Sequence, residues 1–192
     1  MSFDYFHYVP CLRWKQGEYQ GVLRLSSAAK KVFTPLIEVP ELGWDFEEKK
    51  KKKTIDQLLT PFPKRVYEKW GVLPCFVDVM KNIQYSNRSS NGAHPENIVF
   101  TGLREKGCLA MPVIGLERDN AHLDEIKATL AKDQRGVCFR ITTEQAARSS
   151  LKTDLDYLLS KLAATSNNCD FILDLGAPNF LPIDGFANVI NA

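Results

Sequence analysis

Charged side chains interrupt a series of short apolar runs at a recurring position. Six runs align without gaps over residues 11–15, 36–40, 76–80, 113–117, 138–142 and 172–176. Their central residues are Arg13, Glu38, Asp78, Gly115, Arg140 and Asp174, and the residues two positions later include Lys15 and Glu117. Because the side chains of a strand alternate between its two faces, these residues are expected to share one face of a sheet.

The acidic members of this set predict acid–base or metal chemistry. Glu38, Asp78 and Asp174 are the candidate catalytic residues, and they are also the candidate metal ligands. Carboxylates whose neighbours offer only oxygen suit Mg²⁺ or Mn²⁺ better than zinc. The pattern therefore favours one of these two ions as a cofactor. It identifies no reaction, and it leaves open whether the protein is an enzyme.

The basic members predict anion binding. Arg13, Lys15, Glu117 and Arg140 are the candidate substrate-binding residues. Guanidinium groups form paired hydrogen bonds with phosphate or carboxylate groups, so the ligand is expected to be small and anionic. The alternative is structural. In that case Arg13 or Arg140 bridges to the acids in a lattice of ion pairs that binds no ligand.

Helical patterns separate the runs and must position them. The clearest amphipathic patterns are Leu151, Leu155, Leu158, Leu159 and Leu162, and before them Ile55, Leu58, Leu59, Phe62 and Val66, which Pro61 and Pro63 interrupt. Thr54 and Gln57 have the spacing of a capping box. Strands that alternate with helices predict right-handed β–α units and a parallel sheet.

The polarity of the shared face favours a TIM-type (β/α) barrel over the alternative, an open parallel α/β sheet. Along each run this face changes from apolar to charged, as a barrel interior does towards the carboxyl ends of its strands. About six β–α units are present, whereas a complete barrel has eight in roughly 250 residues. Residues 1–192 are therefore expected to be a single α/β domain and a fragment of a longer barrel. The alternatives are a truncated copy of such a barrel and a protomer that closes its sheet against another partner.

Composition narrows the partners and the compartment. With a formal net charge of +2, the electrostatic field of the whole molecule is too weak to favour binding to nucleic acid. No apolar run is long enough to span a membrane. The start of the chain lacks the features of a signal peptide. Five cysteines without C-x-x-C spacing argue against a disulfide framework or a zinc ribbon. We expect a cytoplasmic protein with free thiols and make no prediction of its oligomeric state.

Three other features have weaker interpretations. The run Lys49–Lys53, with Lys64 and Arg65, is a candidate nucleic-acid contact, although such runs are usually solvated. His94, in a long polar loop, is a candidate mobile acid or base. His122 is interpreted as an ordinary surface or helix position. Phosphate-binding glycine loops and the common hydrolase motifs are absent from the sequence.

Several of these segments together resemble a known family. Residues 8–18 followed by 34–40 resemble the opening of the beta-protein family, which is named after a protein of a T-even coliphage and is widespread in bacteria. Residues 112–119, 135–141 and 174–176 are similar to its later blocks. Family members are commonly longer, so the resemblance covers their amino-terminal part. It implies a phage or phage-defence setting and carries no catalytic set over to this chain.

Three functions are compatible with these observations. The first is a beta-family protein with a ligand site at the barrel mouth, which binds a protein partner or a small anionic ligand. The second is a metal-assisted hydrolase or lyase that acts on a phosphorylated or nucleotide-like substrate. The third, a nucleic-acid-binding module, is disfavoured by the low net charge.

Overall fold

A six-stranded parallel sheet organises the computed structural model, which describes residues 3–45, 50–51, 53–81, 83 and 86–176. The strands lie in the order β1-β2-β5-β6-β7-β8, and every pairing is parallel. Their bounds are β1 Cys11–Leu12, β2 Leu36–Glu38, β5 Cys75–Asp78, β6 Ala110–Ile114, β7 Val137–Thr142 and β8 Cys169–Asp174. Sequence neighbours within this sheet are therefore spatial neighbours, as a progressive β–α fold requires.

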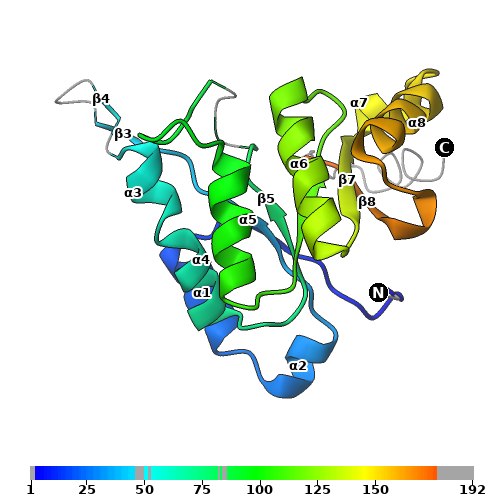
Figure 1. The fold of residues 1–192 in the computed structure, drawn as a ribbon. Helices are drawn as coiled ribbons and strands as arrows, with labels where there is room; N and C mark the ends of the chain where they lie inside the picture. Colours follow the sequence, from blue (N-terminus) through cyan, green and yellow to red (C-terminus); the bar gives the residue numbers. More distant parts are fainter. Residues whose placement is uncertain (1–2, 46–49, 52, 82, 84–85, 177–192) are drawn as a thin grey trace.

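Helices connect consecutive strands. They are α1 Gln16–Leu23, α2 Ser27–Lys31, α3 Ile55–Leu59, α4 Phe62–Lys69, α5 Pro95–Glu105, α6 Asn120–Asp133, α7 Thr143–Ala146, α8 Leu151–Leu162 and the 3-10 turn η1 Ser166–Asn168. A small antiparallel pair, β3 Trp44–Asp45 and β4 Lys50–Lys51, stands apart from the main sheet. Figure 1 shows α4, α5, α6 and α8 in succession along the sheet, and each contacts the next.

The two faces of the sheet bury different partners. On the outer face, Ile37 and Val77 pack against α3, α4 and α5, and further along Ile114 and Phe139 pack against α6 and α8. The inner face buries an apolar floor of Leu36, Phe76, Met111, Val113 and Cys138, against which Phe3, Val9 and Ile172 also pack. No helix contributes to this floor among the described residues. Helices on one face only distinguish this sheet from a doubly wound one.

The strand register confirms the predicted faces but corrects the gapless alignment. Glu38 lies opposite Asp78, as predicted. Phe76, however, pairs with Met111, so Asp78 lies level with Val113 rather than with Gly115. Arg140 likewise pairs with Ile172, which is two residues before the predicted partner Asp174. Each slip is of two residues, so it preserves the face of every side chain and gives the stagger of a curled sheet.

The sheet is curled but open. Strands β1 and β8 form its two edges, and no pairing joins them within the described part of the chain. The predicted TIM-type barrel is therefore not confirmed as a closed structure. The alternative prediction, an open parallel α/β sheet, fits the observed topology.

Local signals in the sequence place most helix ends. Thr54 and Gln57 form the predicted capping box of α3, the prolines separate α3 from α4, and Asp119 caps α6. Ser26 caps the short helix α2, and its side chain accepts a hydrogen bond from the Ala29 N–H. The first strand is shorter than predicted because the chain turns at Trp14, whose φ is +52°.

Candidate functional site

Arg140, near the carboxyl end of β7, lies at the centre of a cluster of carboxylates. Its Nη1 donates hydrogen bonds to Glu38 Oε1 at 2.7 Å and to Asp78 Oδ2 at 3.2 Å. Its Nε and Nη2 lie 2.9 and 2.8 Å from Asp174 Oδ2. These four residues are called the charge cluster below. It joins the carboxyl ends of β2, β5, β7 and β8.

The charge cluster is shielded from water. The side chain of Asp78 is 0% exposed, those of Glu38 and Arg140 are 6% and 10% exposed, and that of Asp174 is 19% exposed. Burial raises the pKa of the Asp78 carboxyl, although Arg118 and Arg140 act against this. At Asp174 burial is outweighed by a hydrogen bond from the Gly176 N–H and by Arg140 and Lys81, which leave the pKa lowered.

Two further cations balance the three carboxylates. Arg118 Nη2 lies 3.4 Å from Asp78 Oδ1, and its Nη1 donates to the Met80 carbonyl oxygen. Lys81 Nζ lies 3.7 Å from Asp174 Oδ2. Three positive side chains therefore face three negative ones, which is the condition under which buried charges are tolerated.

Above the charge cluster, at the carboxyl ends of the strands, lies a cavity of about 690 Å³, called the mouth cavity below. It is lined by Cys11, Arg13, Lys15, Glu18, Glu38, Pro40, Glu41, Lys81, Arg140, Asp174 and Gly176. Arg13 and Lys15 are exposed, and neither side chain forms an ion pair with the described residues. Within the described part of the chain, the mouth cavity thus has a floor whose charges are matched and two cations without an ion-pair partner, and the carboxylates Glu18 and Glu41 also line it.

A strained turn places these two cations. Trp14, between them, adopts left-handed backbone geometry, which costs a residue other than glycine about 1–2 kcal/mol. Its side chain is 1% exposed and packs against the Tyr19 ring, whose centroid is 5.9 Å away. Burial of the indole stabilises this strained backbone conformation. Arg13 and Lys15 therefore flank a residue that is fixed in the core.

The predicted site residues therefore separate into three groups. Glu38, Asp78, Arg140 and Asp174 meet in the charge cluster, whereas Arg13 and Lys15 line the mouth cavity without joining it. Glu117 joins neither group: its side chain is 68% exposed and its Oε1 accepts a hydrogen bond from Arg148 at 2.8 Å, although it lines a cavity of about 160 Å³ beside the charge cluster. The bridging of acids by Arg140 is the arrangement that the structural alternative anticipated.

Arg118, Lys81 and Cys11 belong to the site but were not predicted as members of it. Arg118 and Lys81 follow their strands by several residues, outside the aligned positions. The Sγ of Cys11 lies 3.3 Å from Glu38 Oε1 and 3.7 Å from Arg140 Nη2. Burial, with Glu38 and Asp174 acting in the same direction, raises the pKa of this thiol to about 11 in spite of Arg140. Its position on the same face as Glu38, on a neighbouring run, is the signal that could have identified Cys11.

The carboxylates do not leave an obvious space for a metal ion. Among the described residues, no group of three or more His, Cys, Asp or Glu side chains is arranged to hold one. Glu38, Asp78 and Asp174 do converge, but the point where they converge is filled by the Arg140 guanidinium. A metal at this point would have to displace that group.

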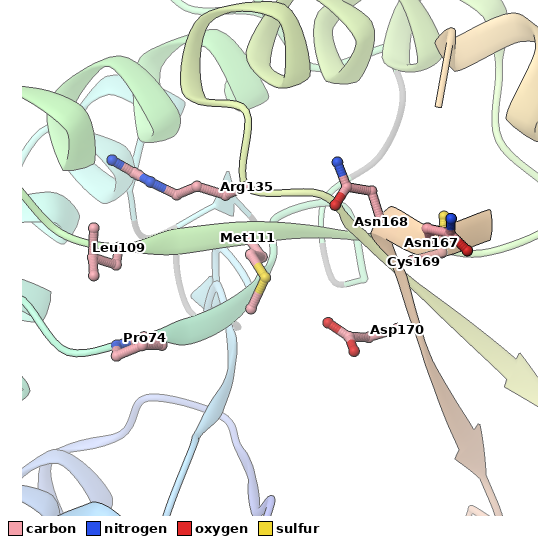
Figure 2. A pocket seen from close by; sticks show the side chains of 8 residues that line it. All are labelled: Pro74, Leu109, Met111, Arg135, Asn167, Asn168, Cys169 and Asp170. Carbon is pink, nitrogen blue, oxygen red and sulfur yellow. The ribbon is translucent and has the colours of Figure 1, made fainter. Parts of the chain in front are cut away.

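A second cavity of about 380 Å³ opens at the opposite, amino-terminal end of the sheet. Figure 2 shows Met111 and Asp170 pointing to the same side of the sheet, with Asn167, Asn168 and Cys169 at its margin. Arg135, which also lines it, already donates to the Cys108 carbonyl oxygen at 2.9 Å. Ligands of parallel α/β folds bind at the carboxyl ends of strands, so the mouth cavity is the stronger candidate.

The remaining predictions concern lysines, thiols and membranes. Lys49 and Lys52 lie outside the described residues, and Lys64 pairs with Glu68 at 3.6 Å. All five cysteines are free, as predicted. No helix in the described part of the chain is long and apolar enough to cross a membrane.

Helices on one face of a curled parallel sheet, with a charged site at the strand ends, define an α/β protein of the half-barrel kind. Within that class the chain belongs to the Beta protein family, whose model matches residues 8–192. This confirms the resemblance inferred from the sequence. Comparisons with curated proteins and with solved structures gave no match.

Proposed function

We propose that this protein binds a small anionic ligand, carrying a phosphate or carboxylate group, in the mouth cavity. The observation that supports this proposal is the pair of exposed cations, Arg13 and Lys15, which line a cavity of about 690 Å³ and form no ion pair with the described residues. Lys81, with a side chain 43% exposed, adds a third positive group on the same cavity. Cations without protein partners attract anions and form strong, charge-assisted hydrogen bonds with them.

The charge cluster has a supporting part in this proposal. Its acids are matched by cations, so the floor does not repel an incoming anion as three free carboxylates would. The guanidinium of Arg140 already pairs with three carboxylates, so it is expected to hold these side chains in place rather than to bind the ligand. The roles proposed from the sequence are thus divided. Arg13 and Lys15 bind the anionic ligand, and the charge cluster holds the floor of the mouth cavity in place.

Binding is tested by calorimetric titration of the whole chain with inorganic phosphate, pyrophosphate and AMP at low ionic strength. We expect saturable binding of at least one probe and at least a tenfold loss of affinity in the double variant Arg13→Gln/Lys15→Gln, because hydrogen bonds to charged groups contribute about 1.5–3 kcal/mol each. Lys132→Gln, an exposed lysine near the end of α6, is the matched control and should bind as the wild type does. Equal affinity in the double variant would contradict the proposal.

Cys11 supplies an independent readout. It lines the mouth cavity, whereas Cys169 lies on the other cavity and Cys75, Cys108 and Cys138 are buried. In a Cys169→Ser background, a bound anion should slow maleimide labelling of Cys11. If Cys11 were labelled at the same rate with and without a saturating concentration of the anion, the ligand would not bind in the mouth cavity.

The second candidate function is a metal-assisted hydrolase or lyase for phosphorylated or nucleotide-like substrates. The convergence of Glu38, Asp78 and Asp174 from three strands favours it. It requires Mg²⁺ or Mn²⁺ binding that Asp78→Asn and Glu38→Gln weaken. A titration with Mg²⁺ alone therefore separates it from simple anion binding.

We also propose that the sheet is part of a larger (β/α) barrel. On the outer face of β8, Phe171 and Leu173 are 54% and 46% exposed, whereas the corresponding residues of the inner strands are buried beneath helices. A further β–α unit would cover them. Coding DNA that continues in frame beyond codon 192 with such units is the expected observation, and an immediate stop codon would contradict it. The phage or phage-defence setting rests on the family resemblance alone.

A further inference from the structure

Three titratable side chains are buried together between the amino ends of α5 and α6. Glu96, in the first turn of α5, and His122, in the first turn of α6, are both 0% exposed. His94, the N-cap of α5, is 4% exposed, and its ring centroid lies 6.0 Å from that of His122. The structure thus corrects two interpretations from the sequence: His94 is not a mobile loop residue and His122 is not an ordinary surface position.

The side chains of Glu96 and His122 approach each other closely. His122 Nδ1 lies 3.3 Å from Glu96 Oε1. Neither carboxylate oxygen of Glu96 and neither ring nitrogen of His122 makes a regular hydrogen bond to the described residues. His94 cannot satisfy them through its Nδ1, which accepts the Glu96 backbone N–H at 3.2 Å. An ionised carboxylate that is buried without hydrogen bonds would strongly destabilise the fold, so the neutral, protonated form of Glu96 is favoured.

The charges that surround the pair come from every neighbouring element. They are Asp78 on β5, Arg118 after β6, Asp119 and Glu125 at the start of α6, and Arg88 before α5. Burial raises the pKa of Glu96 well above its usual value, and Asp78 acts in the same direction while Arg118 opposes it. Burial lowers the pKa of His122 to about 3, and Arg118 and His94 add to this effect.

We propose that Glu96 and His122 share one proton and form a pH-sensitive clasp between the amino ends of α5 and α6. With one proton the pair is neutral, and the separation of 3.3 Å between His122 Nδ1 and Glu96 Oε1 allows that proton to lie between the two helices. Without a proton it leaves a buried anion near Asp78, and with two it leaves a buried cation near Arg118. Both of these states oppose the packing of α5 against α6.

The pH dependence follows from the number of protons bound in each state. In the unfolded chain the pair binds one proton only between the ordinary pKa values of 4.5 and 6.5. Above pH 6.5 the folded pair retains a proton that the unfolded chain has lost, so stability falls as pH rises through the raised pKa of Glu96. Below pH 4.5 the unfolded chain binds the extra proton, so stability falls as pH decreases towards the lowered pKa of His122.

The clasp is tested by urea unfolding of the whole chain between pH 4 and pH 9. Above pH 6.5 the unfolding equilibrium constant of the wild type should rise by up to tenfold per pH unit relative to that of Glu96→Gln, which keeps a hydrogen-bond donor but cannot ionise. Glu105→Gln, at the exposed end of the same helix, is the matched control and should follow the wild type. Identical pH profiles for Glu96→Gln and the wild type would overturn the proposal.

A second measurement does not depend on the folding of a variant. The imidazole of His122 in the native protein should remain neutral down to pH 4 in NMR titrations, while the partly exposed His7 provides a comparison. Titration of His122 near its ordinary pKa would overturn the clasp. Neither experiment involves a ligand, so failure here is distinguishable from failure of the proposed anion binding.

Discussion

Replacement of Arg140 by methionine is expected to lower the free energy of unfolding by about 3–5 kcal/mol. The substitution keeps a long apolar stem but removes the guanidinium from three shielded carboxylates, and breaking a buried ion pair on one side leaves uncompensated charge. Arg118 and Lys81 remain, but each contacts only one of those acids. Chemical denaturation at pH 7 measures the loss.

Arg148→Met is the matched control for this experiment. Arg148 also forms an ion pair at 2.8 Å, with Glu117, but the two side chains are 44% and 68% exposed. Exposed pairs contribute about 0–1 kcal/mol, so a small change is expected. If Arg140→Met were as mild as Arg148→Met, the charge cluster would have no structural role.

Gly136→Ala is expected to destabilise the protein by about 2–4 kcal/mol. Gly136 precedes β7 and has a φ of +85°, which disfavours any residue with a Cβ atom. A Cβ added there would also overlap the carbonyl oxygen of Asn168, just before β8. Because the obstructing atom belongs to the backbone, the clash cannot be relieved by a rotamer change and adds to the strain. Thermal unfolding should detect it directly.

Gly71→Ala separates the cost of backbone strain from the cost of the steric clash. Gly71 has a similar φ of +90°, but a Cβ there would meet no atom within 4 Å. Its replacement should therefore cost only the backbone strain, about 1 kcal/mol. Equal losses at Gly71 and Gly136 would contradict a close approach of the β7 and β8 connections.

The faces of the sheet were predictable from local pattern. In Ile37-Glu38-Val39 a single carboxylate between two apolar residues is enough to show which side chains point inwards, and both apolar residues are buried in the outer core. The capping box at Thr54 was equally local, and so was the interruption by prolines. Such signals depend only on residues that are close in sequence, so they can be recognised without knowledge of the fold.

The stagger of the strands was not predictable in the same way. It results from the curl of the whole sheet, which no single strand specifies. A gapless alignment therefore placed Asp78 level with Gly115 and Arg140 level with Asp174, although both pairs are offset by two residues. Because a slip of two preserves the face, Glu38, Asp78, Arg140 and Asp174 still lie on the predicted face and meet in the charge cluster.

Side chains beyond the strand ends were missed for a related reason. Arg118 reaches Asp78 across 40 residues of sequence, from a loop whose path depends on the packing of α6. His122 occupies a helical position that pattern alone cannot distinguish from a surface position. Its burial becomes evident only when α5 and α6 are placed side by side.

The wide spacing of the charge cluster along the chain has a consequence for biosynthesis. Glu38 is separated from Arg140 by 102 residues, and Asp78 from Arg140 by 62. On the ribosome both acids therefore emerge long before the guanidinium that neutralises them. A nascent chain that ends before β7 already has Arg118 to pair with Asp78, but it would have to bury Glu38 without the guanidinium of Arg140, so its first strands should remain hydrated until β7 is available. The sheet is expected to form late and as a unit, with a long interval during which chaperones can engage the nascent chain.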